Sequence, residues 1–509
     1  MNSNKRTIIN VIAQYLRTII NICLSLYSTR LVLQALGESD YGIFMLVGGV
    51  ITMLAFIVNS MVITTQRFLS FFYGKKETDN VKVYFNNSLM LHILLGFIFV
   101  AVLAIFAALF FDKLNIDANR MKVAHAVFYV LMFNLILSFI TAPFRATFIA
   151  KENIVFISCV DVIDGILKVA LVIYVLPIFS DKLISYTHIL TAIAILNLVV
   201  FALVATKKYK EVNLIPQKKL LSKNIIYKLF GFAGWTTYST GCIIGRTQGL
   251  AIILNSVYGT IINAAYGIAI QVSNSVNFLA QAIVNALSPR VVKAEGAGNR
   301  NEMFKLANKT SKFCFLLLAL FSIPIIFEMS DILHFWLGND KDIDNTAMFC
   351  RFILIAAICD QTSVGHGLAN QAIGRIRNYT LIVNSIKLLT LPIALAAIII
   401  GKDVKYSMIA FLAIECVCAI ARIFFMKITE HMSVKDYLQN VIAKILVPLA
   451  GIIAASWAVT QFIHLNNRFF LTVFVAVIVG IILIFATALD DEERIFVKNV
   501  LHRKHLENN

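Results

Sequence analysis

The chain has 509 residues, of which 59% are hydrophobic and 14% are charged, and its mean hydropathy is +0.81. Soluble domains carry charge on about a quarter of their residues. This composition therefore excludes a soluble globular enzyme and indicates an integral membrane protein. The formal net charge is +17, and its meaning depends on where along the chain the basic residues lie.

The N-terminal segment contains an apolar stretch that holds Gln14, Arg17 and Asn21, and no small-residue cleavage site follows it. We therefore expect a first spanning helix and not a signal peptide. A spanning helix needs about 20 mostly apolar residues. On this basis the sequence predicts an all-α polytopic membrane protein with fourteen transmembrane helices, at residues 10–34, 41–64, 86–111, 121–143, 155–178, 183–206, 226–256, 260–288, 310–330, 346–369, 378–400, 405–427, 440–464 and 468–489.

The distribution of Lys and Arg predicts the orientation of these helices. With both termini cytoplasmic, 29 basic residues fall in the cytoplasmic ends and loops, 8 fall on the opposite side and 8 fall inside helices. Short cytoplasmic loops carry such an excess, whereas the loops at 37–40 and 339–342 are acidic and fall outside. The positive charge thus indicates orientation and contact with anionic lipid headgroups, and no nucleic-acid partner is expected. We expect a bacterial inner membrane protein.

A short internal repeat suggests two related halves. Tyr-Gly-Ile occurs at 41–43 and at 266–268, each time after a leucine-rich helix end and a glycine. The spacing between these copies pairs the first six helices with the next six. Two pseudo-symmetric six-helix halves are a common transporter plan. The expected domains are 1–206 (first half), 207–225 (basic cytoplasmic linker, the hinge between the halves), 226–430 (second half), 431–489 (two additional helices) and 490–509 (cytoplasmic tail).

Two arginines lie deep in predicted helices. Arg17 is about 15 Å into the first helix at 1.5 Å per residue, and Arg246 lies similarly deep in the seventh, its repeat partner. Charges at membrane depth are usually paired or face a cavity, and a guanidinium suits bidentate binding of phosphate. We expect both in one central substrate cavity. The alternative is that each pairs with a buried acid or with helix carbonyls.

Other charged side chains also fall inside helices. Asp161, Asp164 and Lys168 share one face of the fifth helix, and the spacing of Asp164 and Lys168 favours an ion pair. Asp360 and Glu415 are ion-coupling candidates, as are Asp161 and Asp164, because burial raises the pKa of a carboxyl group. Asp360 and Glu415 are equally well explained as counter-ions of an arginine or of a further intramembrane cation. That cation is Lys387. Four other basic residues lie near helix ends, and their side chains are expected to reach the membrane surface: Arg30, Arg351, Arg422 and Lys444.

The eighth predicted helix carries a stripe of amide side chains. At 100° per residue its five amides fall within a narrow sector. Such a stripe indicates a wet path that sugar hydroxyls can use, although amides also hold membrane helices together. The five amides are Asn263, Asn274, Asn277, Gln281 and Asn285. With Gln14, Arg17, Arg246 and Lys387, the last four of them form the predicted substrate cavity.

No catalytic or nucleotide-binding motif occurs in the sequence. We therefore expect no enzyme activity, no cofactor and no metal site. Energy for transport would come from an ion gradient or from the gradient of the substrate itself.

Several segments resemble a known family. The stretch LVLQALGESDYGIF, the segment PFRATFIAKENI at 143–154 and the segment PRVVKAEGAGN at 289–299 are similar to bacterial polysaccharide flippases. These belong to the multidrug, oligosaccharidyl-lipid and polysaccharide exporter superfamily. The resemblance implies transfer of an undecaprenyl-diphosphate-linked oligosaccharide to the periplasmic leaflet by alternating access. It also implies cationic cavity residues at Arg17 and Arg246, and a lipid groove at the last two helices.

The expected partners are this lipid-linked substrate, membrane lipids, a proton or sodium ion, and a polysaccharide polymerase with its chain-length regulator. One alternative is a flippase for lipid-linked peptidoglycan precursors. A second is a cation-coupled drug or metabolite exporter of the same superfamily. A third is a membrane-embedded glycosyltransferase or polymerase, which would normally have a sizeable outer loop.

Overall fold

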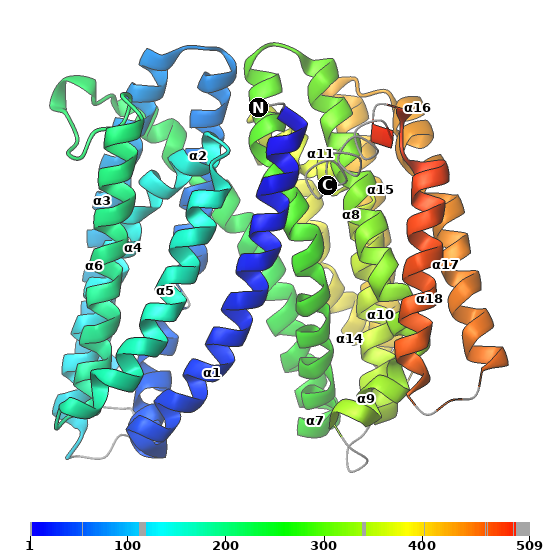
Figure 1. Cartoon of the computed structure of the whole chain (residues 1–509), viewed down its shortest axis with the longest axis horizontal. Coiled ribbons are helices and arrows are strands. Elements are labelled where there is room, and N and C mark those ends of the chain that lie inside the picture. Colours follow the sequence, from blue (N-terminus) through cyan, green and yellow to red (C-terminus); the bar gives the residue numbers. More distant parts are fainter. Residues whose placement is uncertain are drawn as a thin grey trace, which may run out of the picture. The chain divides into compact units, whose positions relative to one another are not determined.

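The computed structural model describes residues 3–52, 54–110, 119–337, 343–401, 403–463, 465, 467–491 and 493–494. Loop 339–342, most of the predicted tail 490–509 and the side chain of Arg30 lie outside this description. The described residues are almost entirely helical and contain no β-strand (Figure 1). The helices are α1 (Ser3–Thr52), α2 (Ala55–Gly74), α3 (Thr78–Phe110), α4 (Met121–Ala150), α5 (Ile154–Tyr174), α6 (Lys182–Lys208), α7 (Lys223–Gly296), α8 (Arg300–Phe327), α9 (Met329–Leu337), α10 (Ile343–Gln361), α11 (Val364–Ile373), α12 (Ile376–Tyr379), α13 (Ser385–Leu388), α14 (Thr390–Gly401), α15 (Lys405–Glu430), α16 (Val434–Tyr437), α17 (Ala443–Phe462) and α18 (Arg468–Leu483).

The prediction of an all-α polytopic membrane protein is confirmed. Each of the fourteen predicted segments overlaps one or more of these helices. Within the described residues, nine helical spans are long and apolar enough to cross a membrane, or ten if the bent pair α10 and α11 is one span. Helices dominate because lipid offers no hydrogen-bond partner, so each backbone group must be satisfied within the chain.

The chain divides into two compact units. Unit 1 comprises Met1–Thr240 and Ser288–Asn299, and unit 2 comprises Gly241–Leu287 and Arg300–Asn509. Two of the boundaries fall within α7, and the third directly precedes α8. The sequence repeat predicts a different division, with residues 207–225 as the linker between two six-helix halves. That division stays a prediction.

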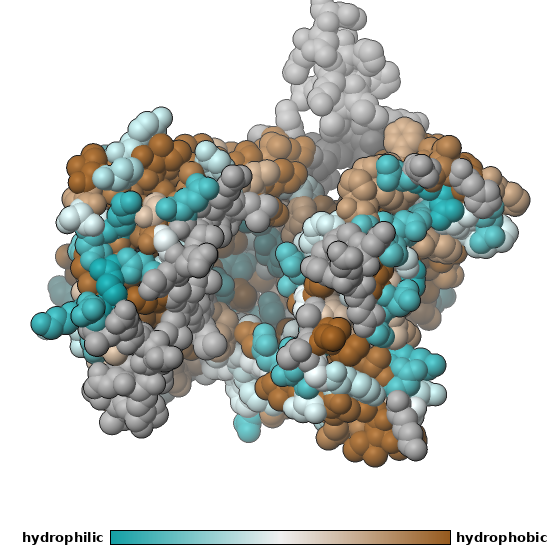
Figure 2. All heavy atoms as spheres, turned by 90° about the horizontal axis from the view of Figure 1, so that it is seen from below, coloured by the Kyte–Doolittle hydropathy of each residue, from teal (hydrophilic) through white to brown (hydrophobic). Residues whose placement is uncertain are grey.

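Each unit is a bundle of closely packed helices (Figure 1). In unit 1, α4 packs on α2, α3 and α6, while α1 packs on α5. In unit 2, α8 packs on α10, α11, α17 and α18, while α15 packs on α10 and α14. Large apolar side chains are exposed on most of these helices, and Figure 2 shows apolar patches on the surface of the chain. Such a surface requires lipid as its solvent.

The internal repeat is visible in the backbone. Gly37 interrupts α1 with φ 78° and ψ 167°, and Gly259 interrupts α7 with φ 81° and ψ −172°. Only glycine adopts this conformation readily. Each break therefore divides its helix into two segments. Positive φ angles recur at one constant offset along the chain in three pairs, namely Gly37 with Gly259, Lys76 with Gly298, and Glu152 with Gly374.

The ends of α2 and α7 cross at two glycines within unit 1. A Cβ atom at Gly74 would lie 2.8 Å from the carbonyl carbon and Cα of Lys293, and one at Gly296 would lie 2.9 Å from the carbonyl carbon of Phe71. Phe71 and Lys293 are separated by the same offset as the positive φ pairs, and so are the two glycines. The crossing is thus reciprocal, with each repeat providing one glycine and one backbone contact.

The basic linker is anchored to α3. Asn86 donates to the Gln217 carbonyl at 3.1 Å and accepts from the Gln217 N–H at 2.7 Å. Asn87 donates to the Leu220 carbonyl and accepts from the Ser222 N–H, both at 2.8 Å. Both asparagines are fully buried. Each side-chain amide bonds to a backbone C=O and a backbone N–H of the linker. These hydrogen bonds fix the linker to unit 1.

Arg120 joins α1 to the start of α6 within unit 1. Its Nε lies 2.8 Å from Asp40 Oδ1, and its Nη1 lies 2.8 Å from Asp181 Oδ2. Asp181 also caps α6 by accepting from the N–H groups of Leu183 and Ile184. Burial by itself would raise the pKa of Asp181, but the Ile184 N–H and Arg120 outweigh it and hold that pKa below its ordinary value.

Two ion-paired contacts tie the last helices to unit 2. The first joins Arg468 to Glu328, with Nε–Oε1 and Nη2–Oε2 distances of 2.8 and 3.0 Å. The second joins buried Lys312 to Glu493 at 2.8 Å. Because Glu328 is completely buried beside Arg468, its charge is compensated by a bidentate pair, the strongest arrangement for these groups. Helices α17 and α18 are thus integral parts of unit 2.

Candidate functional site: two charged cavities

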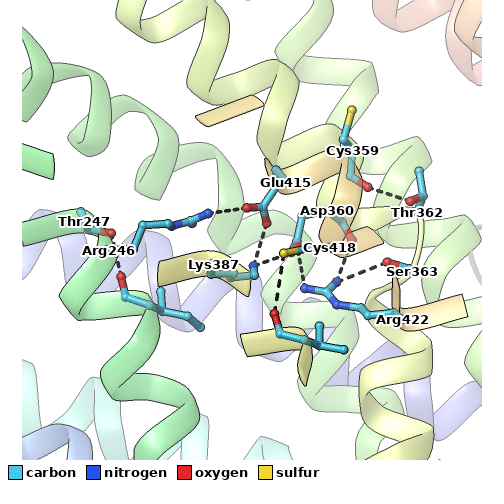
Figure 3. A network of polar contacts seen from close by, with 12 residues as sticks. Arg246, Thr247, Cys359, Asp360, Thr362, Ser363, Lys387, Glu415, Cys418 and Arg422 are labelled. Atoms are coloured by element: carbon cyan, nitrogen blue, oxygen red, sulfur yellow. Dashed lines mark hydrogen bonds and ion pairs between the residues drawn. The ribbon is translucent and has the colours of Figure 1, made fainter. Parts of the chain in front are cut away.

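The intramembrane charges of unit 2 form one network (Figure 3). We call it the unit 2 charge cluster: Arg246, Asp360, Lys387, Glu415 and Arg422. Lys387 Nζ lies 2.7 Å from Glu415 Oε1 and 3.2 Å from Asp360 Oδ1, while Arg422 Nη2 lies 2.6 Å from Asp360 Oδ1. Arg246 Nη1 donates to Glu415 Oε2. Each carboxylate therefore has two cationic partners, and Lys387 links the two halves of the network.

These side chains are shielded from water. The exposed fraction of Glu415 is 4%, that of Lys387 6% and that of Asp360 23%. Single buried charges are costly, so such groups occur in compensated sets. Three cations face two carboxylates, which leaves one positive charge when all five are ionised.

Local breaks in the helices place these charges. Helix α10 ends at Gln361 and meets α11 at 46°. Arg422 Nη1 lies 3.3 Å from the Asp360 carbonyl and 3.3 Å from Ser363 Oγ, so it bonds to polar groups on both sides of the break. A π-helical turn, Thr380–Asn384, closely precedes Lys387. Such turns often occur at functional sites.

The unit 2 charge cluster borders a cavity of about 470 Å³. Arg246 lines it, with its guanidinium 4.5 Å from the centre of the Phe411 ring. The Nε of Arg246 is buried and has no hydrogen-bond partner within the described part of the chain. The polar lining also includes Thr247, Gln248, Ser273, Asn274, Asn277, Gln281, Gln361, Asp360, Lys387 and Glu415.

Unit 1 also contains intramembrane charges, in two neighbouring ion-paired groups that we call the unit 1 charge cluster: Arg17, Arg145 and Asp161 in one group, and Asp164 and Lys168 in the other. Arg145 binds Asp161 through two contacts, Nη1–Oδ1 at 2.9 Å and Nη2–Oδ2 at 2.6 Å, and Arg17 Nη1 lies 2.8 Å from Oδ2. Lys168 Nζ lies 2.8 Å from Asp164 Oδ2. Again three cations face two carboxylates.

A second cavity, of about 490 Å³, adjoins this cluster. Asp161, Asp164 and Lys168 line it together with Asn21, Ser28, Tyr41 and Tyr186. Arg145 lines a smaller hollow of about 290 Å³ with Asn59 and Asn197.

The helices that supply the charges correspond in part between the repeats. In unit 1 they are α1, α4 and α5, which correspond to the part of α7 that holds Arg246, to α10 and to α13 in unit 2. Helix α15 supplies Glu415 and Arg422 in addition. The two clusters are therefore related in position but are not copies of each other.

Comparison with known proteins identifies the fold. The family model MatE matches residues 247–398. A MATE solved in complex with MaD3S superposes with a TM-score of 0.72 at 12% identity, over 84% of this chain and 96% of that chain. A MATE in the straight conformation gives 0.71 at 12% identity, with coverages of 84% and 96%. This chain has the MATE transporter fold.

A MOP superfamily transporter from Pyrococcus furiosus is also similar, with a TM-score of 0.68 at 11% identity, over 82% of this chain and 95% of that chain. Its binding pocket is described as having reverse polarity, which suggests a different function for that protein. No curated protein sequence matches this chain. MATE proteins are transporters and not enzymes. The likeness to these structures establishes the fold of this chain.

Within the MATE fold, most predicted cavity residues of unit 2 do line one cavity. Asn274, Asn277, Gln281, Arg246 and Lys387 all do so. Asn285 instead accepts a hydrogen bond from Gln281 Nε2 at 3.0 Å. Asp360 and Glu415 are counter-ions of the cations around them, one of the two roles expected for them.

The predicted residues of unit 1 are placed differently. Arg17 pairs with Asp161, the alternative role expected for it, and Gln14 is buried without lining the cavity. Asp164 and Lys168 form the predicted ion pair. Arg17 and Arg246 lie in different units, and the expectation of a shared central cavity stays a prediction.

Two functional candidates escaped the sequence analysis. Arg145 lies just beyond the predicted helix at 121–143, but α4 continues to Ala150. Arg422 was expected to reach the surface, and this expectation is wrong: only 8% of its side chain is exposed, because Asp360 holds it inside the bundle. Arg351 and Lys444 are also held by contacts, to Ser330 and Asp490 respectively.

A candidate metal site is not found in the residues that the structure describes, where no three His, Cys, Asp or Glu side chains come together. The carboxylates nearest to the cavities are each occupied by basic side chains. The two charged cavities are therefore the candidate functional sites.

Proposed function

We propose that this MATE-fold chain transfers a lipid-diphosphate-linked oligosaccharide from the cytoplasmic to the periplasmic leaflet of a bacterial inner membrane, by alternating access. The observation that carries the proposal is the excess of cations in both charge clusters. A diphosphate, or an acidic sugar, supplies the negative charge that three cations and two carboxylates lack.

The amide lining of the unit 2 cavity supports a glycan as the second part of the substrate. Asn274, Asn277 and Gln281 border the same cavity as Arg246. Amides donate and accept hydrogen bonds, as sugar hydroxyls do. An anion site beside a row of amides suits a molecule with a charged group next to a polyhydroxylated one.

The other partners of this transport follow from the same proposal. The lipid tail would lie along the exposed apolar faces of α17 and α18, which carry Leu446, Trp457, Phe470 and Phe474 at the surface. A proton or sodium ion would be carried by a carboxylate of the clusters: Asp360, Glu415, Asp161 or Asp164. A polysaccharide polymerase and its chain-length regulator would act on the product. Both termini would be cytoplasmic.

The test is leaflet transfer of a lipid-diphosphate oligosaccharide in vesicles reconstituted with the purified chain. Wild type should transfer it, and Arg246→Ala and Arg17→Ala should each lose most of this activity. Arg375→Ala is a matched control, since Arg375 is exposed and lies outside both clusters. Transfer that persists in both arginine variants would assign the two arginines a structural role.

A second candidate is a drug or metabolite exporter. Four carboxylates border the two cavities, and one that loses its basic partner would bind a cationic substrate. The same vesicles distinguish the two functions, because an exporter would accumulate small cations and leave the glycolipid in place. Transfer of lipid-linked peptidoglycan precursors in preference to other glycans would instead indicate the precursor flippase.

A further inference from the structure

In each charge cluster one arginine is bound less completely than the other cation on the same carboxylate. Arg145 binds both oxygens of Asp161, whereas Arg17 makes one contact to Oδ2. In unit 2, Lys387 contacts Oε1 of Glu415 at 2.7 Å and Oδ1 of Asp360 at 3.2 Å, whereas Arg246 contacts only Oε2 of Glu415 (Figure 3).

This difference decides which cation can leave. A buried carboxylate that loses its only partner is strongly destabilised. If Arg246 turns away from Glu415, Lys387 remains on the other oxygen. If Arg17 leaves Asp161, Arg145 still holds both oxygens. Neither departure strands a buried charge.

The two less bound arginines also share a place in the fold. Arg17 lies on α1 and Arg246 on α7, the first helix of each repeat, although their positions along the helix differ by two turns. Arg246 borders the cavity and has an Nε without a partner in the described residues. An anion in that cavity would compete with Glu415 for this guanidinium.

We propose that Glu415 and Asp161 are internal counter-anions that a substrate anion replaces on Arg246 and Arg17, and that Lys387 and Arg145 are positioning residues that keep these carboxylates compensated during the exchange. This inference rests on the proposed function in taking the substrate as anionic. It adds that the affinity of these arginines for the anion is tuned by residues that never touch it.

The experiment measures binding of geranyl diphosphate to the full chain in detergent by isothermal titration calorimetry, with geraniol as the uncharged matched probe. Wild type should bind the diphosphate in preference to geraniol, and Arg246→Ala should lose that preference. Glu415→Gln should bind about tenfold more tightly, because a competing charge at contact distance is removed. Glu430→Gln is the control, since Glu430 is also on α15 but pairs with Arg300.

A double-mutant cycle separates positioning from direct contact. Lys387→Met leaves Glu415 to Arg246 alone, so binding should weaken, but the same change in a Glu415→Gln background should have little effect. An equal loss in both backgrounds would overturn the inference, because Lys387 would then touch the anion itself. Unchanged or weaker binding by Glu415→Gln, or no preference for the diphosphate in wild type, would overturn it as well.

If Lys387→Met does not fold, the Glu415→Gln measurement decides by itself, since an amide keeps the shape of the carboxyl group. The outcome is also distinguishable from failure of the proposed function. Glycolipid transfer can fail while diphosphate binding follows the predicted pattern, and in that case the exchange stands and the substrate is another anion.

Discussion

Replacing Gly74 by alanine puts a methyl group against the backbone of α7. The new Cβ would lie 2.8 Å from two backbone atoms of Lys293, well inside van der Waals contact. Overpacking of this kind costs about 1–3 kcal/mol. The upper end applies here because a backbone atom has no rotamer by which to move away.

A second effect opposes this cost. Alanine is favoured over glycine in a helix by up to about 1 kcal/mol, so the net loss of stability for Gly74→Ala should be about 2 kcal/mol. Gly234→Ala is the matched control, because Gly234 is in α7 and a Cβ there meets nothing within 4 Å. The control should gain up to about 1 kcal/mol, which places the two variants about 3 kcal/mol apart.

The assay is equilibrium unfolding of both variants in mixed SDS micelles, followed by circular dichroism. Gly296→Ala should behave like Gly74→Ala, and the double variant should lose less than the sum, because one methyl group already separates the helices. Equal stability of Gly74→Ala and Gly234→Ala, within about 0.5 kcal/mol, would refute the reasoning about the crossing.

Three further predictions concern other contacts. Arg422→Ala should lower the free energy of unfolding by about 3–5 kcal/mol because it strands the buried Asp360 carboxylate, and adding Asp360→Asn should restore part of the loss; a double variant no more stable than the single one would contradict this. Asn87→Ala should expose the linker to trypsin by removing the two hydrogen bonds between this side chain and the linker, at a cost of about 1–3 kcal/mol, as limited proteolysis with wild type as reference would detect. Because the folded pKa of Asp181 is lowered, its stabilisation is present above the ordinary carboxyl pKa and is lost as the pH falls through the lowered value, so Asp181→Asn should flatten the acid limb of a stability profile.

The helices and their repeat could be predicted from the sequence because both depend on local properties. Long apolar runs are interrupted by charged loops, and lipid allows such runs only one backbone structure. The repeated Tyr-Gly-Ile indicated an offset between the halves that is close to, but not identical with, the one that separates the breaks at Gly37 and Gly259.

The partners of the charges could not be predicted, because they depend on helix rotation and packing. Arg17 could be identified as deep, but its partner Asp161 lies 144 residues further along the chain, on another helix. Only the ion pair of Asp164 and Lys168 could be predicted, since both residues lie on one helix in the i,i+4 relation. Arg145 was missed because the predicted helix ended at residue 143, whereas α4 continues past Pro143 to Ala150, as a membrane helix can.

Unit 1 is assembled from two separate stretches of chain, and this has a consequence for biogenesis. Its last piece, Ser288–Asn299, follows residues 241–287 of unit 2 in the sequence. While the ribosome is still producing those residues, the end of α7 that packs against Gly74 of α2 has not yet been made. The first unit is therefore completed only after part of the second has been inserted, and its early helices depend on lipid or on the insertion machinery to shield this part of α2 until then.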